Sequence, residues 1–223
     1  MNASLKEIFE LHVQKTIKAL EANNMTAYYV PSAKDVVDKV AQLLHEGDTV
    51  STGGSASLTE AGVIDHLKSG RYHYLDRYEE GLTAEQINTL FRRVFSADAY
   101  LCSANAVTTQ GEIYNVDGNS NRVSAILFGP TSVIMVVGRN KLVNNLDEAV
   151  RRVKTIAAPA NAARLDCGTY CAKTGECVSL LKGGEMASGC TSDRRVCANF
   201  VVMGRQRVKG RVKVILVGEE LGY

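Results

Sequence analysis

Tryptophan is absent from this chain of 223 residues, and aromatic residues make up only 6% of it. Proteins that hold single-stranded nucleic acids stack the bases on aromatic side chains, which are scarce here. The net charge is also small, at +2. The one strongly basic stretch, MGRQRVKGRVK, has the alternation typical of the solvent face of a strand hairpin. The composition therefore argues against a nucleic-acid partner.

Long apolar runs are lacking too. The stretch VSAILFGPTSVIMVVG is interrupted by Gly129 and Pro130, whereas a membrane span needs about 18 uncharged apolar residues in a row. The first residues, MNASLKEIFELHVQKTIKAL, carry Lys and Glu where the apolar core of a secretory signal would lie. We therefore expect a soluble, cytoplasmic protein without a membrane span, in which cysteine thiols stay reduced.

Histidine is scarce as well. We interpret the four that occur as ordinary surface or core residues: His12, His45, His66 and His73. The sequence shows no Ser-His-Asp, Cys-His or metal-hydrolase motif. Because no histidine lies between residues 165 and 223, a metal ion bound in that region would be held largely by sulfur.

Cysteine, by contrast, is concentrated in residues 165–199, with the spacing C-x3-C-x5-C-x12-C-x6-C formed by Cys167, Cys171, Cys177, Cys190 and Cys197. This segment is rich in Gly, Ser, Lys and Arg and too poor in apolar residues to fold around a core of its own. Reduced thiols so arranged indicate an iron–sulfur cluster or an all-cysteine zinc site. The spacing matches neither zinc ribbons nor ferredoxins, so ordinary reduced cysteines without a cofactor remain the alternative.

The rest of the chain alternates between patterns typical of strands and of helices. This alternation predicts one α/β domain over residues 1–223, built on a mostly parallel sheet with helices on both faces. The cysteine-rich segment lies within that domain, and a hairpin closes the chain. We expect helices at 4–22, 32–44, 57–68, 83–95 and 146–156, strands at 26–30, 48–52, 72–75, 99–103 and 132–137, and the hairpin from 200–203 and 212–217.

Three loops after predicted strands are candidates for a ligand site, because ligands of such sheets bind at the carboxyl ends of the strands. In the first, Gly53, Gly54 and Ser55 precede a helix, and their N–H and hydroxyl groups suit a phosphate or carboxylate. The alternative is a tight turn with a serine cap. In the third, Asn140 and Lys141 follow a strand; Lys141 neutralises a bound anion or is a solvated loop lysine.

The second loop, SANAVTTQGEIYNVDGNSNR, is the most polar of the three. Its side chains offer donors and acceptors for a polyol or phosphorylated ligand, with Asn105, Thr108, Asn115 and Arg122 as binding residues. Either Glu112 or Asp117 could serve as a base or nucleophile. The alternative is a pair of β-turns, since Gln110-Gly111 and Asp117-Gly118-Asn119 are also strong turn signals.

Several long segments together resemble the lactate-utilization (LUD) domain family. They are VSTGGSASLTEAGV, SANAVTTQGEIYNVDGNSNRVSAILFGPTSVIMVVGRNKLV, CAKTGEC, SDRRVC and VKVILVGEELGY, and the resemblance spans about residues 5–223. It implies a fold similar to the superfamily of ribose-5-phosphate isomerase, glucosamine-phosphate deaminase and CoA-transferase. The polar loop and the glycine turn would then face one cleft. The chain resembles short stand-alone members with a C-terminal cysteine group, but has a longer insert, VSLLKGGEMASG, within that group.

Members of that family occur in bacterial operons for oxidising L-lactate to pyruvate, beside iron–sulfur proteins. The first hypothesis is therefore a redox or electron-transfer component of lactate or small-carboxylate oxidation. The cleft would receive a small carboxylate, and the chain would work with other lactate-oxidation subunits. An iron–sulfur cluster would be held by Cys171, Cys177, Cys190 and Cys197, with Cys167 as a possible substitute.

A second hypothesis is a metal-independent isomerase or transferase for a phosphorylated or CoA-linked small molecule. Glu112 or Asp117 would be its base and Lys141 its anion clamp, and the cysteines would be structural or would surround zinc. A third is a non-catalytic assembly or regulatory protein. In each case the chain could form a homo-oligomer.

Overall fold

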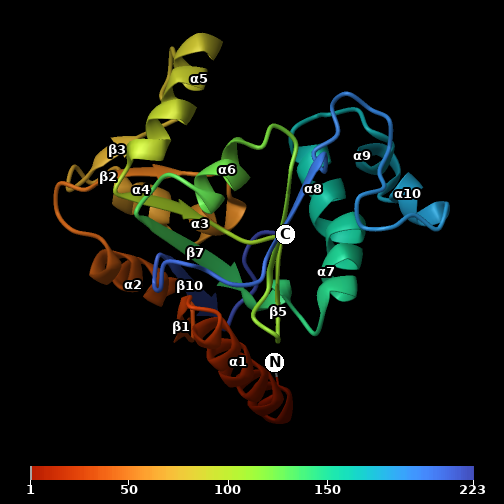
Figure 1. The fold of residues 1–223 in the computed structure, drawn as a ribbon, viewed down its shortest axis with the longest axis horizontal. Coiled ribbons are helices and arrows are strands. Elements are labelled where there is room, and N and C mark those ends of the chain that lie inside the picture. Colours follow the sequence, from red (N-terminus) through yellow and green to blue (C-terminus); the bar gives the residue numbers. More distant parts are fainter. Residues whose placement is uncertain (1) are drawn as a thin grey trace.

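The computed structural model describes residues 2–223, so Met1 of the predicted domain lies outside the described residues. A six-stranded sheet forms the centre of the fold (Figure 1), and all five of its strand pairings are parallel. The chain's last strand lies in its interior, which makes the end of the sequence part of the core. In spatial order the strands are β1 (Thr26–Val30), β10 (Val212–Val217), β7 (Ser132–Gly138), β4 (Ala99–Cys102), β2 (Thr49–Thr52) and β3 (His73–Leu75).

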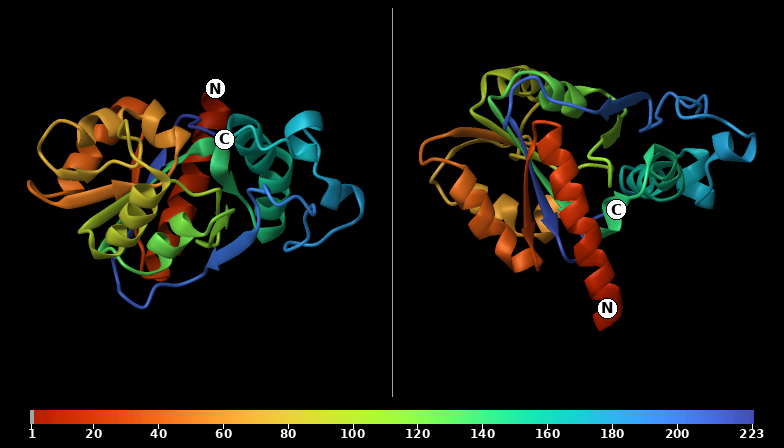
Figure 2. Two further views of the ribbon diagram at one scale, coloured as in Figure 1. Left: turned by 90° about the horizontal axis from the view of Figure 1, so that it is seen from above. Right: turned by 60° about the horizontal axis from the view of Figure 1, so that its bottom comes forward.

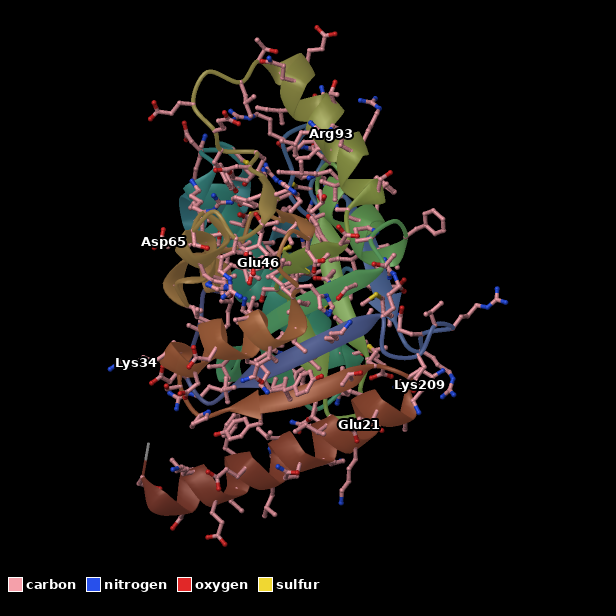
Figure 3. The ribbon with its side chains drawn as sticks, turned by 90° about the vertical axis from the view of Figure 1, so that its left-hand side faces the viewer. Glu21, Lys34, Glu46, Asp65, Arg93 and Lys209 are labelled. Atoms are coloured by element: carbon pink, nitrogen blue, oxygen red, sulfur yellow. The ribbon has the colours of Figure 1, made fainter. Side chains whose placement is uncertain are left out.

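Helices cover both faces of this sheet, as predicted. Residues alternate along each strand, so that Tyr100 and Cys102 face one core while Ala99 and Leu101 face the other. The first face is covered by α1 (Ala3–Ala22) and α6 (Asn121–Leu127), and Figure 3 shows α1 alongside the β1 edge. The second face is covered by α2 (Val36–Leu43), which follows the short helix η1 (Ala33–Asp35), and by α3 (Ala56–Glu60) and α4 (Val63–Leu67).

A second, four-stranded sheet packs beside the first. In spatial order it contains β8 (Leu142–Val143), β5 (Ala106–Thr108), β6 (Ile113–Asp117) and β9 (Asn199–Met203). Its outer face meets α7 (Leu146–Arg152) and α8 (Ala158–Arg164) around Tyr114, Val116 and Val153. The polar loop after β4, predicted to be a ligand site or a pair of β-turns, therefore contains two strands. Strands β5 and β6 pair with each other, and β6 also pairs with β9, which comes much later in the sequence.

The closing hairpin was predicted wrongly. Strand β9 pairs antiparallel with β6 in the small sheet, whereas β10 lies between β1 and β7 in the large sheet. Both strands are apolar and separated by a short basic turn, which is the local pattern of a hairpin. Their partners are long-range, and no local signal encodes them. Residues 204–211 therefore connect the two sheets instead of turning within one.

Two predicted helices also differ from those observed. The helix expected at 57–68 is divided into α3 and α4 by Gly62, whose φ of 71° is left-handed. The helix expected at 146–156 continues to Arg164 through η4 (Val153–Ala157), a π-helical turn. Pro159 follows that turn at the start of α8, where its missing N–H is tolerated. A capping box of Thr83 and Gln86 begins α5 (Ala84–Arg93), which is followed by η2 (Val94–Ser96).

The cysteine-rich segment lies with α7 and α8 on one side of the molecule, away from α2–α4 (Figure 1; Figure 2). It contains two short helices, α9 (Tyr170–Thr174) and α10 (Val178–Leu181), joined by turns. The prediction that residues 1–223 form one domain, with residues 165–199 as a distinct segment within it, stays a prediction. Within residues 2–223, no helix is long and apolar enough to cross a membrane.

Candidate functional site

A cavity of about 70 Å³ lies at the carboxyl ends of three neighbouring parallel strands. Gly54 reaches it from the loop after β2, and Ser57 from the first turn of α3. Ser103 reaches it from the end of β4, and Lys141 from η3 (Arg139–Lys141), which follows β7. The remaining wall comes from the second sheet, from α8 and from the chain's last residue, Tyr223. The three loops predicted from the sequence therefore converge on one site, as ligand sites of parallel sheets do.

Lys141 is the most unusual side chain in this cavity. It is only 3% exposed, and its Nζ donates hydrogen bonds to Ser57 Oγ at 2.8 Å and Ser103 Oγ at 3.0 Å. Among the described residues no carboxylate lies within ion-pair distance of it. Burial lowers the pKa of the Lys141 amine to about 7, and the nearby guanidinium groups of Arg152 and Arg122 add to this effect. A substantial share of this amine is therefore neutral at physiological pH.

Arg152 fixes the backbone on which Lys141 stands. Its Nε donates to the carbonyl oxygen of Asn140, and its Nη1 donates to that of Asn105, both at 2.7 Å. The Asn140 side chain in turn accepts from the N–H of Leu221 and donates to the carbonyl of Gly222. Asn140, predicted as a ligand-binding residue, therefore ties the C-terminal segment to the site and does not line the cavity.

Arg122, from the start of α6, also lines the cavity. Its guanidinium donates to Asn115 Oδ1 at 2.7 Å, to Val116 O at 2.6 Å and to Asn105 Oδ1 at 3.2 Å. Its Nε lies 3.8 Å from a carboxylate oxygen of Asp117. The structure thus brings together four residues predicted from the polar loop, but most donors of Arg122 are used within the protein. The positive charge of Arg122 therefore affects the cavity electrostatically, whereas its N–H groups stabilise the polar loop between β4 and α6.

The two predicted bases occupy different places. Asp117 accepts hydrogen bonds from the N–H groups of Asn119, Ser120 and Val123, so its oxygens hold the turn before α6. Glu112 accepts from the hydroxyl of Thr108 at the far end of the β5–β6 hairpin. There Gly111 packs so closely on α1 that an added Cβ would lie 2.6 Å from the backbone of Ala19. Neither Glu112 nor Thr108 lines the cavity.

The glycine turn packs closely against the arginine. A Cβ added to Gly53 would lie 3.0 Å from Arg122 Cδ and equally close to the Tyr100 hydroxyl, so no larger residue fits without displacing one of them. Ser55 lines the cavity and also accepts from the N–H of Leu58, as the capping alternative predicted. The turn therefore combines close packing, a helix cap and a place in the cavity wall.

A larger cleft of about 530 Å³ adjoins the cavity, with which it shares Gly54, Arg122 and Asn161. Its wall carries more positive than negative charge, since it contains Arg77, Arg122, Arg164, Arg194 and Arg195 but only two acidic residues, Asp117 and Asp193. Such a cleft attracts anions.

The four cysteines predicted as metal ligands line a separate small cavity of about 20 Å³: Cys171, Cys177, Cys190 and Cys197. Apolar side chains and Lys154 complete its wall. All six cysteines of the chain are free thiols. In residues 2–223, however, no group of three or more His, Cys, Asp or Glu side chains is arranged to hold a metal ion. Cys167 is not in this cavity and lines the arginine-rich cleft instead.

The surroundings of Cys197 combine burial with charge. Burial raises the pKa of its thiol, Arg195 opposes this shift, and the thiols of Cys190 and Cys177 reinforce it. The Tyr114 hydroxyl, which interacts electrostatically with Cys197, is buried and has no hydrogen-bond partner among the described residues. Lys154 donates to Ser179 Oγ at 3.0 Å and to the carbonyl oxygens of Glu185 and Ser188, which ties the segment to η4.

Sequence reasoning missed several residues of the site. Ser57 and Ser103 were visible as polar residues beside predicted strand ends, but nothing in the sequence pairs them with Lys141. Arg152 lies within a predicted helix, and nothing in the neighbouring sequence distinguishes it from an exposed arginine. Asn161 lies in a part of the chain with no loop or motif signal, and Tyr223 belongs to VKVILVGEELGY, a segment that carried the family resemblance but no predicted site residue. Only the tertiary fold brings the two residues to the cavity.

The fold and the position of the cavity place this chain among the α/β proteins with a parallel sheet. The family model described as LUD domain matches residues 13–217, and the chain belongs to that family. This confirms the resemblance seen in the sequence and classes the chain as a protein of the lactate-utilization type. A crystal structure of a DUF162 family protein from Deinococcus radiodurans has a similar fold, with 18% identity and a TM-score of 0.50, covering 95% of this chain and 98% of that one. A comparison with curated proteins found no match.

Proposed function

We propose that this chain is a redox or electron-transfer component of small-carboxylate oxidation, of the kind its family name indicates. Cys171, Cys177, Cys190 and Cys197 would hold an iron–sulfur cluster. The observation that supports this most directly is that these four thiols, spread over 27 residues of an otherwise polar segment, line one small cavity. Other subunits of lactate oxidation would then be its redox partners, in the cytoplasm.

The residues around the cavity suit a thiolate-held cluster. Lys154 lines it, and Arg195 places Nη2 3.9 Å from the sulfur of Cys197, so positive charge is available to offset that of bound thiolates. The unpartnered hydroxyl of Tyr114 lies buried near Cys197 and can donate to a sulfur. A cluster would supply one-electron transfer at this position.

The thiol set suits an iron–sulfur cluster or a single zinc ion, and the cavity does not choose between them. Within the described residues, no three ligand side chains are arranged to hold a metal ion. The cavity of about 20 Å³ has room for only one or two water molecules. Loading of either metal centre would therefore rearrange the segment, because metal binding and local folding are coupled.

The test is iron and acid-labile sulfide content, with a visible spectrum, on protein purified without oxygen. We expect both elements in the unmodified chain and their loss in a Cys177→Ala, Cys190→Ala double variant. Cys167→Ala is the matched control, because Cys167 belongs to the same segment but lines a different cleft, and it should retain iron and sulfide. Zinc alone, or no metal in the unmodified chain, would contradict the proposal.

One observation supports the second candidate, an isomerase or transferase for a phosphorylated or CoA-linked molecule. The arginine-lined cleft of about 530 Å³ is much larger than lactate needs, and it opens next to Lys141. A thermal-shift series with sugar phosphates, CoA esters and lactate separates the candidates, because a ligand that binds the native state raises Tm with concentration. Stabilisation by phosphorylated ligands or CoA esters, but not by lactate, would favour the second candidate.

A further inference from the structure

We propose that Lys141 is a nucleophilic amine that captures the carbonyl carbon of a small 2-oxo carboxylate as a Schiff base in the cavity between Ser57 and Ser103. This activity requires no metal centre, so it goes beyond the proposed redox role and is tested independently of it. It also changes the role predicted for Lys141 from the sequence, where the side chain was interpreted as a fixed positive charge.

The hydrogen bonds of Lys141 suit a reactive amine, as a comparison with the other buried lysine shows. Lys154, which is 2% exposed, donates to three acceptors, and these match the three N–H bonds of an ammonium ion. Lys141 donates to two acceptors, the hydroxyl oxygens of Ser57 and Ser103, and these match the two N–H bonds of a neutral amine with its lone pair unused. The hydroxyls themselves donate to the carbonyl oxygens of Leu221 and Ala104. In the described residues Nζ has no third partner, and Lys141 lines the cavity.

The electrostatic setting also favours the neutral amine. Lysine becomes a nucleophile in proteins when it is desolvated or placed next to another cation. Both conditions hold here, since Lys141 is buried and the charges of Arg152 and Arg122 act on it in the same direction as burial. Glu60, whose charge opposes them, is itself exposed and accepts a hydrogen bond from the N–H of Gly222.

The size of the cavity selects a small reactant. One water molecule requires about 10–15 Å³ of such space, so about 70 Å³ accommodates roughly five to seven water-sized groups. That is the size of a two- or three-carbon 2-oxo acid. The adjoining cleft attracts the carboxylate through its arginines. Asn161 borders both spaces; its Oδ1 accepts from Arg164 and Tyr223, which orients its amide N–H groups as donors.

The reaction balances without an oxidant. The lone pair of Lys141 Nζ attacks the carbonyl carbon, the C=O π bond opens, and one amine proton passes to the oxygen to form a carbinolamine. The carbinolamine hydroxyl takes up one proton from solvent and leaves as water, while the nitrogen lone pair forms the C=N bond of the iminium. The hydroxyls of Ser57 and Ser103, at hydrogen-bond distance from Nζ, are placed to relay the protons. The resulting iminium draws electrons from the neighbouring carbon, which prepares that carbon for proton loss or bond cleavage.

The experiment is reductive trapping of the full-length protein with glyoxylate or pyruvate and sodium borohydride at pH 8, followed by peptide mass mapping. At that pH an amine with a pKa of about 7 is mostly neutral, and its neutral fraction exceeds that of an exposed lysine by on the order of 100-fold. We expect one dominant adduct, on Lys141. Labelling spread over exposed lysines, with none on Lys141, would overturn the proposal.

Three controls sharpen the result. Lys154→Arg should keep the adduct and Lys141→Met should lose it, while the map of the unmodified protein remains decisive if either variant fails to fold. A neutral aldehyde of similar size should label Lys141 at least tenfold more slowly, and equal labelling would overturn the carboxylate preference.

The Cys177→Ala, Cys190→Ala variant should still be trapped, because the activity does not depend on the metal centre. Loss of trapping in that variant, if it is folded, would contradict this independence.

Discussion

The amine of Lys141 lies 2.8 Å from the hydroxyl oxygen of Ser57, although 84 positions separate the two residues in the sequence. Ser57 follows β2, Lys141 follows β7, and β4 lies between these strands in the sheet. Ser103, at the end of β4, supplies the second hydroxyl. Three adjacent parallel strands thus each deliver one polar group to the same point, because their carboxyl ends lie along one edge of the sheet.

Stability should rise with pH because of Lys141. Its folded-state pKa of about 7 lies below the ordinary lysine value of 10.5, so the unfolded chain binds the proton more tightly. The destabilising contribution is therefore fully present below pH 7 and declines as pH rises through 7 towards 10.5. We expect the free energy of unfolding of the unmodified protein, relative to Lys141→Met, to increase by about 2–3 kcal/mol between pH 7 and pH 9. Urea unfolding of both proteins measures this, and parallel curves would contradict the shifted pKa.

Gly53→Ala should disturb the cavity. The new methyl group would lie 3.0 Å from Arg122 Cδ and from the Tyr100 hydroxyl, in a site with no room for it. We expect a loss of about 1–3 kcal/mol in the free energy of unfolding, which is typical of overpacking. Gly204→Ala is the matched control, since an added Cβ at Gly204 meets nothing within 4 Å. Equal stability of the two variants in urea would show that the loop relaxes freely.

Replacement of Arg152 by methionine should destabilise the protein strongly. Two carbonyl oxygens, of the half-buried residues Asn105 and Asn140, would lose charge-assisted donors that lie 2.7 Å away. The expected cost is about 2–4 kcal/mol, because each carbonyl is left without its donor. Arg151→Met changes the adjacent, exposed arginine and should cost less than about 0.5 kcal/mol. Thermal and urea unfolding distinguish the two, and a similar small loss in both would show that water replaces the lost donors.

Tyr114→Phe should stabilise the metal-free protein and should lower the reduction potential of the protein that holds a cluster. Without metal, removal of a buried hydroxyl that has no partner among the described residues should stabilise the fold by up to about 1 kcal/mol. If the hydroxyl donates to the Cys197 sulfur of a cluster, its removal should make the reduction potential more negative, because hydrogen bonds to sulfur raise that potential. Urea unfolding and a redox titration test the two parts separately. An unchanged potential would show that Tyr114 makes no such contact.

The strands of the large sheet were predictable because each is a short apolar run whose neighbours are turns. The strand at 26–30 and the one at 212–217 have the predicted bounds. Strands β5 and β6 were missed, because their sequence is polar at the turns and their outer partners come from later parts of the chain: β8 pairs with β5, and β9, more than 80 positions away, pairs with β6. For the same reason the final hairpin, which is locally plausible, is wrong. Local patterns define a strand but not its partner.

The sequence alone determined the kind of fold, the three loops after β2, β4 and β7, and the cysteine-rich segment, because hydrophobic period, turn residues and residue spacing are local properties. The tertiary structure alone decided which of the polar residues meet. In the folded protein Lys141 is buried beside two hydroxyl groups and two arginines. Glu112 lies at the far end of the β5–β6 hairpin, and four cysteines line one cavity. Burial and neighbouring charge set the chemistry of a side chain, and both arise only when distant segments pack together.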